Sequence, residues 1–150
     1  MDKIKLEGII QNFISIIPLF KKKLLHDSCK FDKGNLNHSH FQILTVLKKY
    51  GKSPISDVAK KLFISTPNMT KLLNKLIEEG MIERIPGEKD RRVINIDLTE
   101  KGNTYLENRF FEIQSSLIDK ISSLPEDKLD KLNDSLLTLK EVLNEISSDI

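Results

Sequence analysis

Two clusters of polar and cationic residues offer the clearest chemistry in this sequence. Residues 88–92 read Glu-Lys-Asp-Arg-Arg, so three cations fall within four positions. Residues 66–79 carry amides, hydroxyls and lysines between apolar positions that recur with the period of a helix. Such side chains hydrogen-bond to base edges and phosphates in the grooves of nucleic acids. The polar residues of this second cluster are Asn68, Thr70, Lys71, Asn74 and Lys75.

The placement of carboxylates strengthens this interpretation. They are absent from the first turns of the helix expected at 66–79 and occur only at Glu78 and Glu79. A surface helix ordinarily favours acidic residues near its N-terminus because of the helix dipole. An N-terminus without them leaves backbone N–H groups available to a phosphate. In the cluster at residues 88–92, Asp90 can pair with a neighbouring guanidinium and hold the shape of the loop.

The charge of the chain is unevenly distributed. The net charge is only +2, but residues 48–92 contain eleven Lys or Arg against six Asp or Glu. Residues 93–150 contain six against twelve. A basic middle segment with an acidic C-terminal part is expected if one face of the molecule meets phosphates.

Length and composition describe one ordinary globular domain. The chain has 150 residues, of which 39% are hydrophobic and 31% charged. Its longest apolar stretch, residues 9–20, is interrupted by polar residues and is too short to span a bilayer. No signal-peptide cleavage site follows it, and the single cysteine, Cys29, cannot form an internal disulfide. We therefore expect a cytoplasmic protein without a membrane partner.

The sequence contains no recognisable catalytic set. Its serines and threonines lie at expected caps and turns, no glycine-rich phosphate loop follows a strand, and no pair of carboxylates stands out. Catalysis by a side-chain nucleophile needs a base within reach. We therefore predict that the protein is not an enzyme and has no cofactor.

Apolar periodicity predicts the elements that position the two clusters. Pro18 should kink or break the first helix, and Pro125 should separate the last two. Residues 26–38 are polar and predict a loop. The expected helices are 6–25, 39–51, 53–62, 66–79 and two more between 100 and 146, and the expected strands are 82–85 and 93–98.

Capping residues predict where the helices begin. Ser39 and Thr99 are expected N-caps. Ser53-Pro54 and Thr66-Pro67 each combine a hydroxyl with a proline at the first helical position. The order is then helix, tight turn, helix and β-hairpin, with residues 88–92 at the tip of the hairpin. Glycines follow two of the expected helix ends, at Gly51 and Gly80.

The terminal helices carry wider apolar stripes than one neighbouring helix covers. The last helix alternates apolar steps of three and four, as coiled-coil-like packing requires. We expect these helices to pack against a second copy, and an intramolecular bundle is the alternative. The expected dimerisation residues are Leu6, Ile10, Phe13, Leu117, Leu132, Leu136, Leu139, Leu143 and Ile146.

One motif runs through the expected wing: Asp90-x-Arg92, then five residues, then Leu98-Thr99. It resembles the wing pattern of the MarR (multiple antibiotic resistance regulator) family of bacterial transcription factors. Residues 72–84 are similar to the end of that family's recognition helix and its first wing strand. The resemblance implies a mainly helical fold with a small β-hairpin wing, in which N- and C-terminal dimerisation helices carry a winged helix-turn-helix.

The resemblance also implies a homodimer that binds a pseudo-palindromic double-stranded DNA operator, usually as a repressor. The single domain, 1–150, would divide into a helical dimerisation region (1–38 and 100–150) and a DNA-binding lobe (39–99). The 66–79 helix would enter the major groove, Arg92 would reach the minor groove, and Asp90 would brace the wing. The expected DNA-contacting residues are Ser65, Thr66, Asn68, Thr70, Lys71, Asn74, Lys75, Arg84, Lys89, Asp90, Arg91 and Arg92.

By the same resemblance, a ligand in the crevice between the two lobes would weaken DNA binding. We favour a small organic effector, aromatic and anionic as is usual in the family, or no ligand at all. Candidates for the lining of such a pocket are Phe13, Ile17, Phe41 and Leu44, which core packing explains equally well.

Three alternatives remain open. A zinc-responsive regulator would use His26, Cys29, His38 and His40, whose side chains suit that metal. The first C-terminal helix, however, lacks the histidines of the family's zinc sensors, so we predict no metal site. A redox sensor would use Cys29, whose pKa a neighbouring lysine can lower. A helical adaptor that does not bind DNA is the third, and substitution of the wing arginines distinguishes it.

Overall fold

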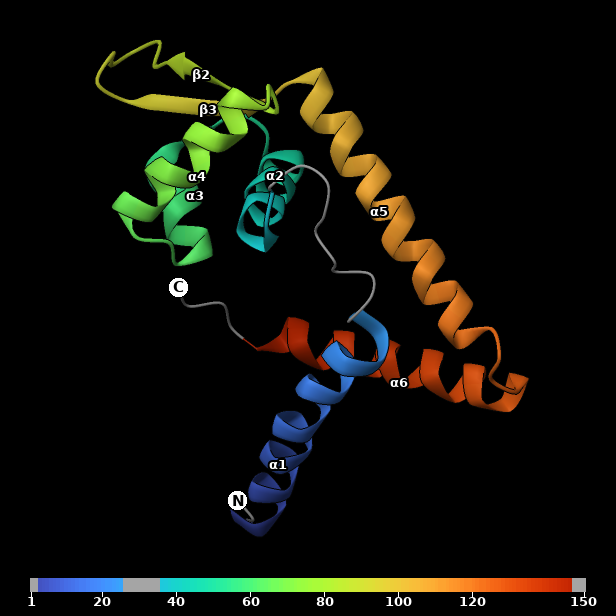
Figure 1. Ribbon diagram of the computed structural model, residues 1–150. Helices are drawn as coiled ribbons and strands as arrows, with labels where there is room; N and C mark the ends of the chain where they lie inside the picture. Colours follow the sequence, from blue (N-terminus) through green and yellow to red (C-terminus); the bar gives the residue numbers. More distant parts are fainter. Residues whose placement is uncertain (1–2, 26–35, 147–150) are drawn as a thin grey trace.

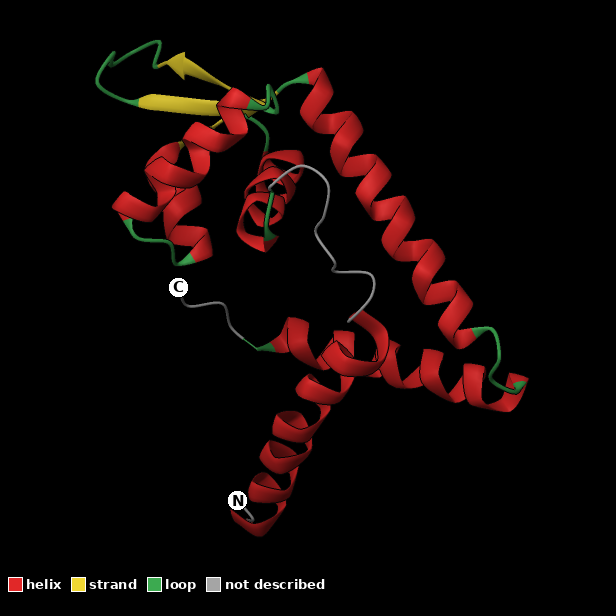
Figure 2. Ribbon diagram, viewed as in Figure 1, coloured by secondary structure: helices red, strands yellow, loops and turns green. Residues whose placement is uncertain are grey.

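The computed structural model describes residues 3–25 and 36–146, which form a mainly helical molecule with one small sheet (Figures 1 and 2). This confirms the predicted fold class. The elements in chain order are α1 (Lys3–Phe20), the π-helical turn η1 (Lys21–Leu25), α2 (His38–Tyr50), β1 (Ser53–Pro54), α3 (Ile55–Leu62), α4 (Thr66–Glu78), β2 (Ile82–Pro86), β3 (Ile94–Leu98), α5 (Glu100–Ile121) and α6 (Glu126–Glu145).

The hydrophobic core lies where α2, α3, α4 and the sheet meet the start of α5. Each of these helices contributes apolar side chains spaced three or four residues apart, so that they share one face. The residues of this core that are at most 1% exposed are Ile43, Leu44, Leu47, Val58, Met69, Leu73, Leu76, Ile96 and Leu106.

The sheet is antiparallel with the strand order β1-β3-β2. The prediction that Ser53 caps a helix is wrong, because Ser53 pairs with Ile96 in β1 and its hydroxyl donates to the Gly51 carbonyl at 2.9 Å. Pro54 is the N-cap of α3, and it cannot supply a capping hydroxyl. The helix itself is confirmed at Ile55–Leu62.

The expected N-cap of α2 is also wrong. Asn37, not Ser39, caps this helix by accepting a hydrogen bond from the His40 amide at 3.2 Å. In return, the Asn37 amide donates to His40 Nδ1 at 2.9 Å. Histidine thus takes the place that glutamate or glutamine holds in a capping box.

The start of α5 is fixed to the base of the hairpin, where β2 begins and β3 ends. Thr99 is its N-cap as predicted, since its hydroxyl oxygen accepts from the Gly102 amide at 3.0 Å. The same hydroxyl donates to the Gly80 carbonyl. A Cβ at Gly102 would lie 2.0 Å from the Met81 carbonyl oxygen, so only glycine permits this approach.

The terminal helices contrast with this core. Pro18 lies inside α1, and the chain changes from α- to π-helical geometry three residues later. Figure 1 shows α1 extending away from the sheet and α6 running from the far end of α5 back to below α2. Among the described residues, α1 and α6 contribute no buried side chain. No helix in the described ranges is long and apolar enough to cross a membrane.

Candidate nucleic-acid interface

Helix α4 has one apolar face in the core and one polar face in solvent. Met69, Leu73 and Leu76 are buried, and the predicted contact residues point away from them. Because the buried positions recur every three or four residues, the polar side chains between them share the opposite face. The exposed residues on this face are Ser65, Thr66, Asn68, Thr70, Lys71 and Asn74, and Lys75 is half-buried beside them.

The N-terminus of α4 lacks its own capping acceptor. The prediction that the Thr66 hydroxyl caps this helix is wrong, because Thr66 is its first residue and Ser65 is the N-cap. Within the described part of the chain, the Ser65 side chain makes no capping hydrogen bond. The first turn contains no acidic residue. The Thr70 hydroxyl donates back to the Thr66 carbonyl at 3.1 Å. The first backbone amides of the helix are thus oriented toward solvent, where they suit an anion.

Lys75 and Arg84, two predicted contact residues, are held by neighbours on the surface. Lys75 Nζ lies 2.8 Å from Glu79 Oε1, and this hydrogen bond raises the pKa of the lysine and lowers that of the glutamate. Arg84 Nη2 donates to Asn74 Oδ1 at 3.1 Å, which connects β2 to the polar face of α4. The spacing of Lys75 and Glu79, four residues apart on one helix, favours the first pair. The second pair joins two elements, and sequence periodicity does not predict it.

The tip of the wing, residues 87–93, is a compact turn. The Gly87 amide donates to the Val93 carbonyl at 2.8 Å, and the Val93 amide donates to the Asp90 carbonyl at 3.1 Å. A Cβ at Gly87 would lie 2.4 Å from the Asp90 carbonyl oxygen, so the turn requires glycine there. Asp90 Oδ1 accepts from the Arg92 amide at 2.9 Å. Asp90 therefore holds the loop through the backbone, where the sequence suggested a guanidinium partner.

The three cations of the tip, Lys89, Arg91 and Arg92, are all exposed. Of the two acidic residues beside them, Glu88 has its Oε1 3.6 Å from Lys52 Nζ. This exposed ion pair joins the tip to the segment before β1. The tip consequently presents positive charge to solvent.

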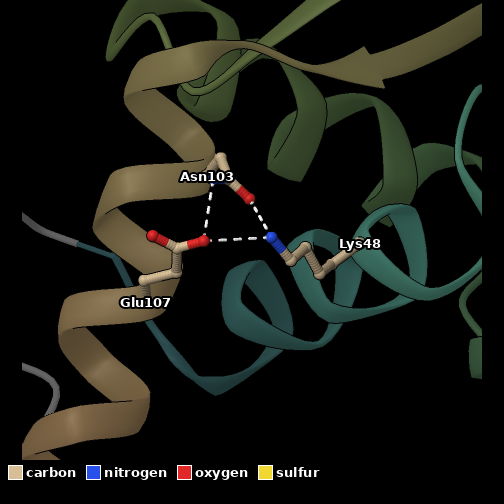
Figure 3. A network of polar contacts seen from close by, with 3 residues as sticks. All are labelled: Lys48, Asn103 and Glu107. Atoms are coloured by element: carbon tan, nitrogen blue, oxygen red, sulfur yellow. Dashed lines mark hydrogen bonds and ion pairs between the residues drawn. The ribbon is translucent and has the colours of Figure 1, made fainter.

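A polar network connects the lobe that contains α4 to α5 (Figure 3). Lys48 Nζ on α2 donates to Asn103 Oδ1 and to Glu107 Oε1, the latter at 3.1 Å. Asn103 Nδ2 donates to the same Glu107 oxygen at 3.0 Å. These bonds lower the pKa of Glu107. Sequence reasoning missed this network, since its members lie 55 and 59 residues apart.

The four residues proposed to line a ligand pocket do not come together in this chain. Leu44 is fully buried inside the core. Phe41 packs edge-to-face against Phe110, with ring centroids 5.4 Å apart. Phe13 and Ile17 lie on the exposed surface of α1. Core and inter-helix packing therefore account for Leu44 and Phe41 in the single protomer.

The metal-site alternative gains no support from the residues that the structure describes. His40 is only 5% exposed and its Nδ1 already accepts the Asn37 amide. Burial, reinforced by the charge of Lys75, lowers the pKa of His40. His38 begins α2, and His26 and Cys29 lie outside the described residues. Within 3–25 and 36–146, no three His, Cys, Asp or Glu residues are grouped to hold a metal ion.

The predicted dimerisation residues lie on three helices. The structure places them outside the core cluster, on α1, α5 and α6. Leu117, Leu132 and Leu139 are half-buried. The exposed ones are Leu6, Ile10, Phe13, Leu136, Leu143 and Ile146, each between 38% and 60% exposed.

A helix-turn-helix followed by a basic hairpin defines a winged helix-turn-helix protein. Residues 36–94 match the MarR family model. The HTH-type transcriptional repressor MdtR of Bacillus subtilis is 25% identical over 116 residues, which cover 77% of this chain and 75% of the relative.

Solved structures share the fold. The YusO protein from Bacillus subtilis has a TM-score of 0.74 at 23% identity, covering 94% of this chain and 99% of that one. A MarR mutant from E. coli complexed with operator DNA has a TM-score of 0.60 at 19% identity, covering 93% and 99%. At these identities the likeness concerns the fold alone.

Proposed function

We propose that this protein is a sequence-specific DNA-binding repressor that acts as a homodimer on a pseudo-palindromic operator. The observation that carries the proposal is the joint exposure of the polar face of α4 and the cationic wing tip on one lobe. Amides and hydroxyls on a helix suit base edges in a major groove, and arginine suits a narrow minor groove. The MarR fold, solved elsewhere with operator DNA, supports this arrangement.

The proposed contacts divide into two kinds. Asn68, Thr70 and Asn74 would read base edges, the last after exchanging its bond with Arg84. Ser65, Thr66, Lys71 and Lys75 would bind phosphates beside the N-terminus of α4. Arg92 would enter the minor groove, with Asp90 holding its backbone and Lys89 and Arg91 meeting the flanking phosphates.

The terminal helices support the proposal of a homodimer. Apolar side chains on α1, α5 and α6 remain in solvent in the single chain, and contiguous apolar surface of this kind marks an association site. We propose that residues 1–38 and 100–150 form the dimer and that residues 39–99 bind DNA. A twofold dimer would then present two copies of α4 to one duplex, which explains why the operator should be palindromic.

Repression and response to an effector complete the proposal. A relative that spans most of this chain bears the name of a transcriptional repressor. Bound effector would change the spacing of the two lobes and so weaken binding to the operator. The bonds among Lys48, Asn103 and Glu107 lie at the junction that such a change would alter.

Selection of bound duplexes from a random library tests the proposal. We expect enrichment of a pseudo-palindromic sequence, and Asn68→Ala should weaken binding to it by about 1–3 kcal/mol. Asn133→Ala, an exposed amide on α6, is the matched control and should leave the affinity unchanged. Equal binding of selected and unselected duplexes would contradict the proposal.

A further inference from the structure

The C-terminal end of α4 closes with a glycine turn. Gly80 has a φ of 70°, and its amide donates to the Ile77 carbonyl at 2.9 Å. The Met81 amide donates to the Leu76 carbonyl at 2.8 Å. These two bonds form a Schellman motif, which satisfies carbonyls of the last helical turn. The carbonyls of Glu79, Gly80 and Met81 lie beyond these bonds and need donors from another element.

The start of α5 supplies a donor to each of these three carbonyls. The Thr99 amide donates to the Met81 carbonyl at 3.1 Å, and the Thr99 hydroxyl donates to the Gly80 carbonyl. Lys101 Nζ donates to the Glu79 carbonyl at 2.6 Å, across 22 positions of the sequence. The end of α4 and the first turn of α5 therefore share one set of hydrogen bonds.

Lys101 occupies a position that its own helix disfavours. It lies in the first turn of α5, where the positive end of the helix dipole repels a cation. Its ammonium group, however, lies at the C-terminal end of α4, where the dipole is negative and a cation is stabilising. A Cβ at Gly80 would lie 3.7 Å from Lys101 Cδ, so the lysine side chain extends along the turn that ends α4. The charge of Lys101 thus serves α4 and not α5.

We propose that Lys101 is a positioning residue for DNA recognition, which fixes the C-terminal end of α4 to α5 and so sets the orientation of α4 on the duplex. Helix α5 contains no glycine or proline between residues 103 and 121, and it leads directly into the region proposed for dimerisation. The orientation of α4 relative to α5 therefore helps to set the distance between the two copies of α4 in a dimer. This inference rests on the proposed function.

A positioning lysine differs from a lysine that binds phosphate. A phosphate contact strengthens binding to every duplex and adds about one unit to the slope of log K against log salt. A residue that orients α4 matters most where two half-sites must be met at a fixed spacing. One base pair moves a half-site by about 3.4 Å along the duplex and turns it by about 35°. The two roles of Lys101 are therefore separable by experiment.

The first test uses the full chain without DNA. Lys101→Ala should make the amide hydrogens of Gly80 and Met81 exchange about threefold faster, because the end of α4 loses a cationic donor. Lys101→Arg keeps a cationic donor and should restore most of the protection. The matched control is Lys128→Ala, an exposed lysine of α6, and it should leave these amides unchanged. Unchanged exchange in Lys101→Ala would overturn the inference.

The second test measures selectivity for half-site spacing. Fluorescence anisotropy compares the selected duplex with versions that have one base pair inserted or removed between the half-sites. In Lys101→Ala we expect the ratio of these affinities to fall about threefold, the salt slope to stay unchanged, and Lys101→Arg to recover the ratio. An unchanged ratio would overturn the inference. An equal loss on all duplexes with a lower salt slope would instead make Lys101 a phosphate contact, and would also overturn it.

The two tests separate this inference from the proposed function. A protein that prefers no duplex would disprove the proposed function and the DNA part of this inference, and faster exchange in Lys101→Ala would still support the bond that holds α4 to α5. A protein that binds its selected duplex, and keeps its spacing selectivity after Lys101→Ala, would overturn this inference alone.

Discussion

The lobe formed by α2–β3 and the helices α1 and α6 treat their apolar residues in opposite ways. In the lobe, Ile43, Leu76 and Ile96 are completely buried within one chain. On α1, Ile4 is 80% exposed, and on α6 Leu137 is 53% exposed. The lobe thus buries these residues within a single protomer, whereas the terminal helices leave apolar surface exposed. We propose that the lobe supplies the folded core and that the terminal helices supply the surface for association.

The largest effect should come from the core of the lobe. Leu76→Ala removes a buried side chain that α4 packs into this core, and it should lower the free energy of unfolding by about 2–5 kcal/mol. Urea denaturation followed by circular dichroism measures the change. Leu124→Ala, at a position 40% exposed between α5 and α6, should cost much less. Equal costs would contradict the view that the lobe holds its own core.

A similarly large effect on association should come from α6. Leu136→Glu with Leu143→Glu places two carboxylates on one stripe, seven residues apart, and burying them in an interface is costly. We expect dimerisation to weaken about a hundredfold or more, about 2.7 kcal/mol, with the lobe still folded. Sedimentation at micromolar concentration measures the change in mass. Lys140→Glu on the same helix is the control, and a dimer that survives the double substitution would place the interface elsewhere.

A smaller effect should follow from changing the wing tip. Arg92→Ala removes a cation whose backbone Asp90 positions. It should weaken binding to the selected duplex about tenfold and reduce the slope of log K against log salt by about one unit for each wing engaged. Fluorescence anisotropy at several salt concentrations provides both numbers. The control Lys131→Ala should leave the slope unchanged. An unchanged slope for Arg92→Ala would show that Arg92 does not contact the DNA.

The smallest effect concerns pH and His40. Burial lowers the pKa of this histidine below the usual value near 6.5, so the folded protein binds the proton less readily than the unfolded chain. The stabilisation is therefore complete above pH 6.5 and is lost as the pH falls from 6.5 toward the lowered pKa. Urea denaturation between pH 7.5 and 5 should show this loss.

His40→Gln keeps a side-chain acceptor for the Asn37 amide and removes the titrating group. This variant should show a flatter dependence of stability on pH in the same range. The same slope in both proteins would mean that another group is responsible.

Local patterns allowed much of the lobe to be predicted. The helices, the hairpin and the cap at Thr99 follow from periodicity and turn residues that act within a few positions of each other. The incorrect N-cap predictions at Ser53 and Ser39 share a cause. In each case the role of the residue depends on a hydrogen-bond or strand partner that the local pattern does not show. Ser53 pairs with Ile96, which lies 43 positions further along the chain. The Asn37 amide gains an unexpected hydrogen-bond acceptor in His40.

The interactions between distant elements were not predictable from the sequence. Lys48 finds Asn103 and Glu107 only after α2 and α5 pack together. In the sequence, an apolar residue such as Leu44 has the same spacing whether it lines a pocket or fills a core. Its complete burial in the structure shows that it is a core residue. The residues of α4 and the wing tip were identified because their chemistry and spacing are local. Their contacts with DNA remain predictions.

The mass of the complex with the selected duplex tests the central claim most directly. We predict that sedimentation will show two copies of the chain on one duplex, and that a duplex carrying half the palindrome will bind much more weakly. Two copies are required because each lobe supplies one α4 and one wing. A single copy that binds the half-site as tightly as the complete operator would contradict the account.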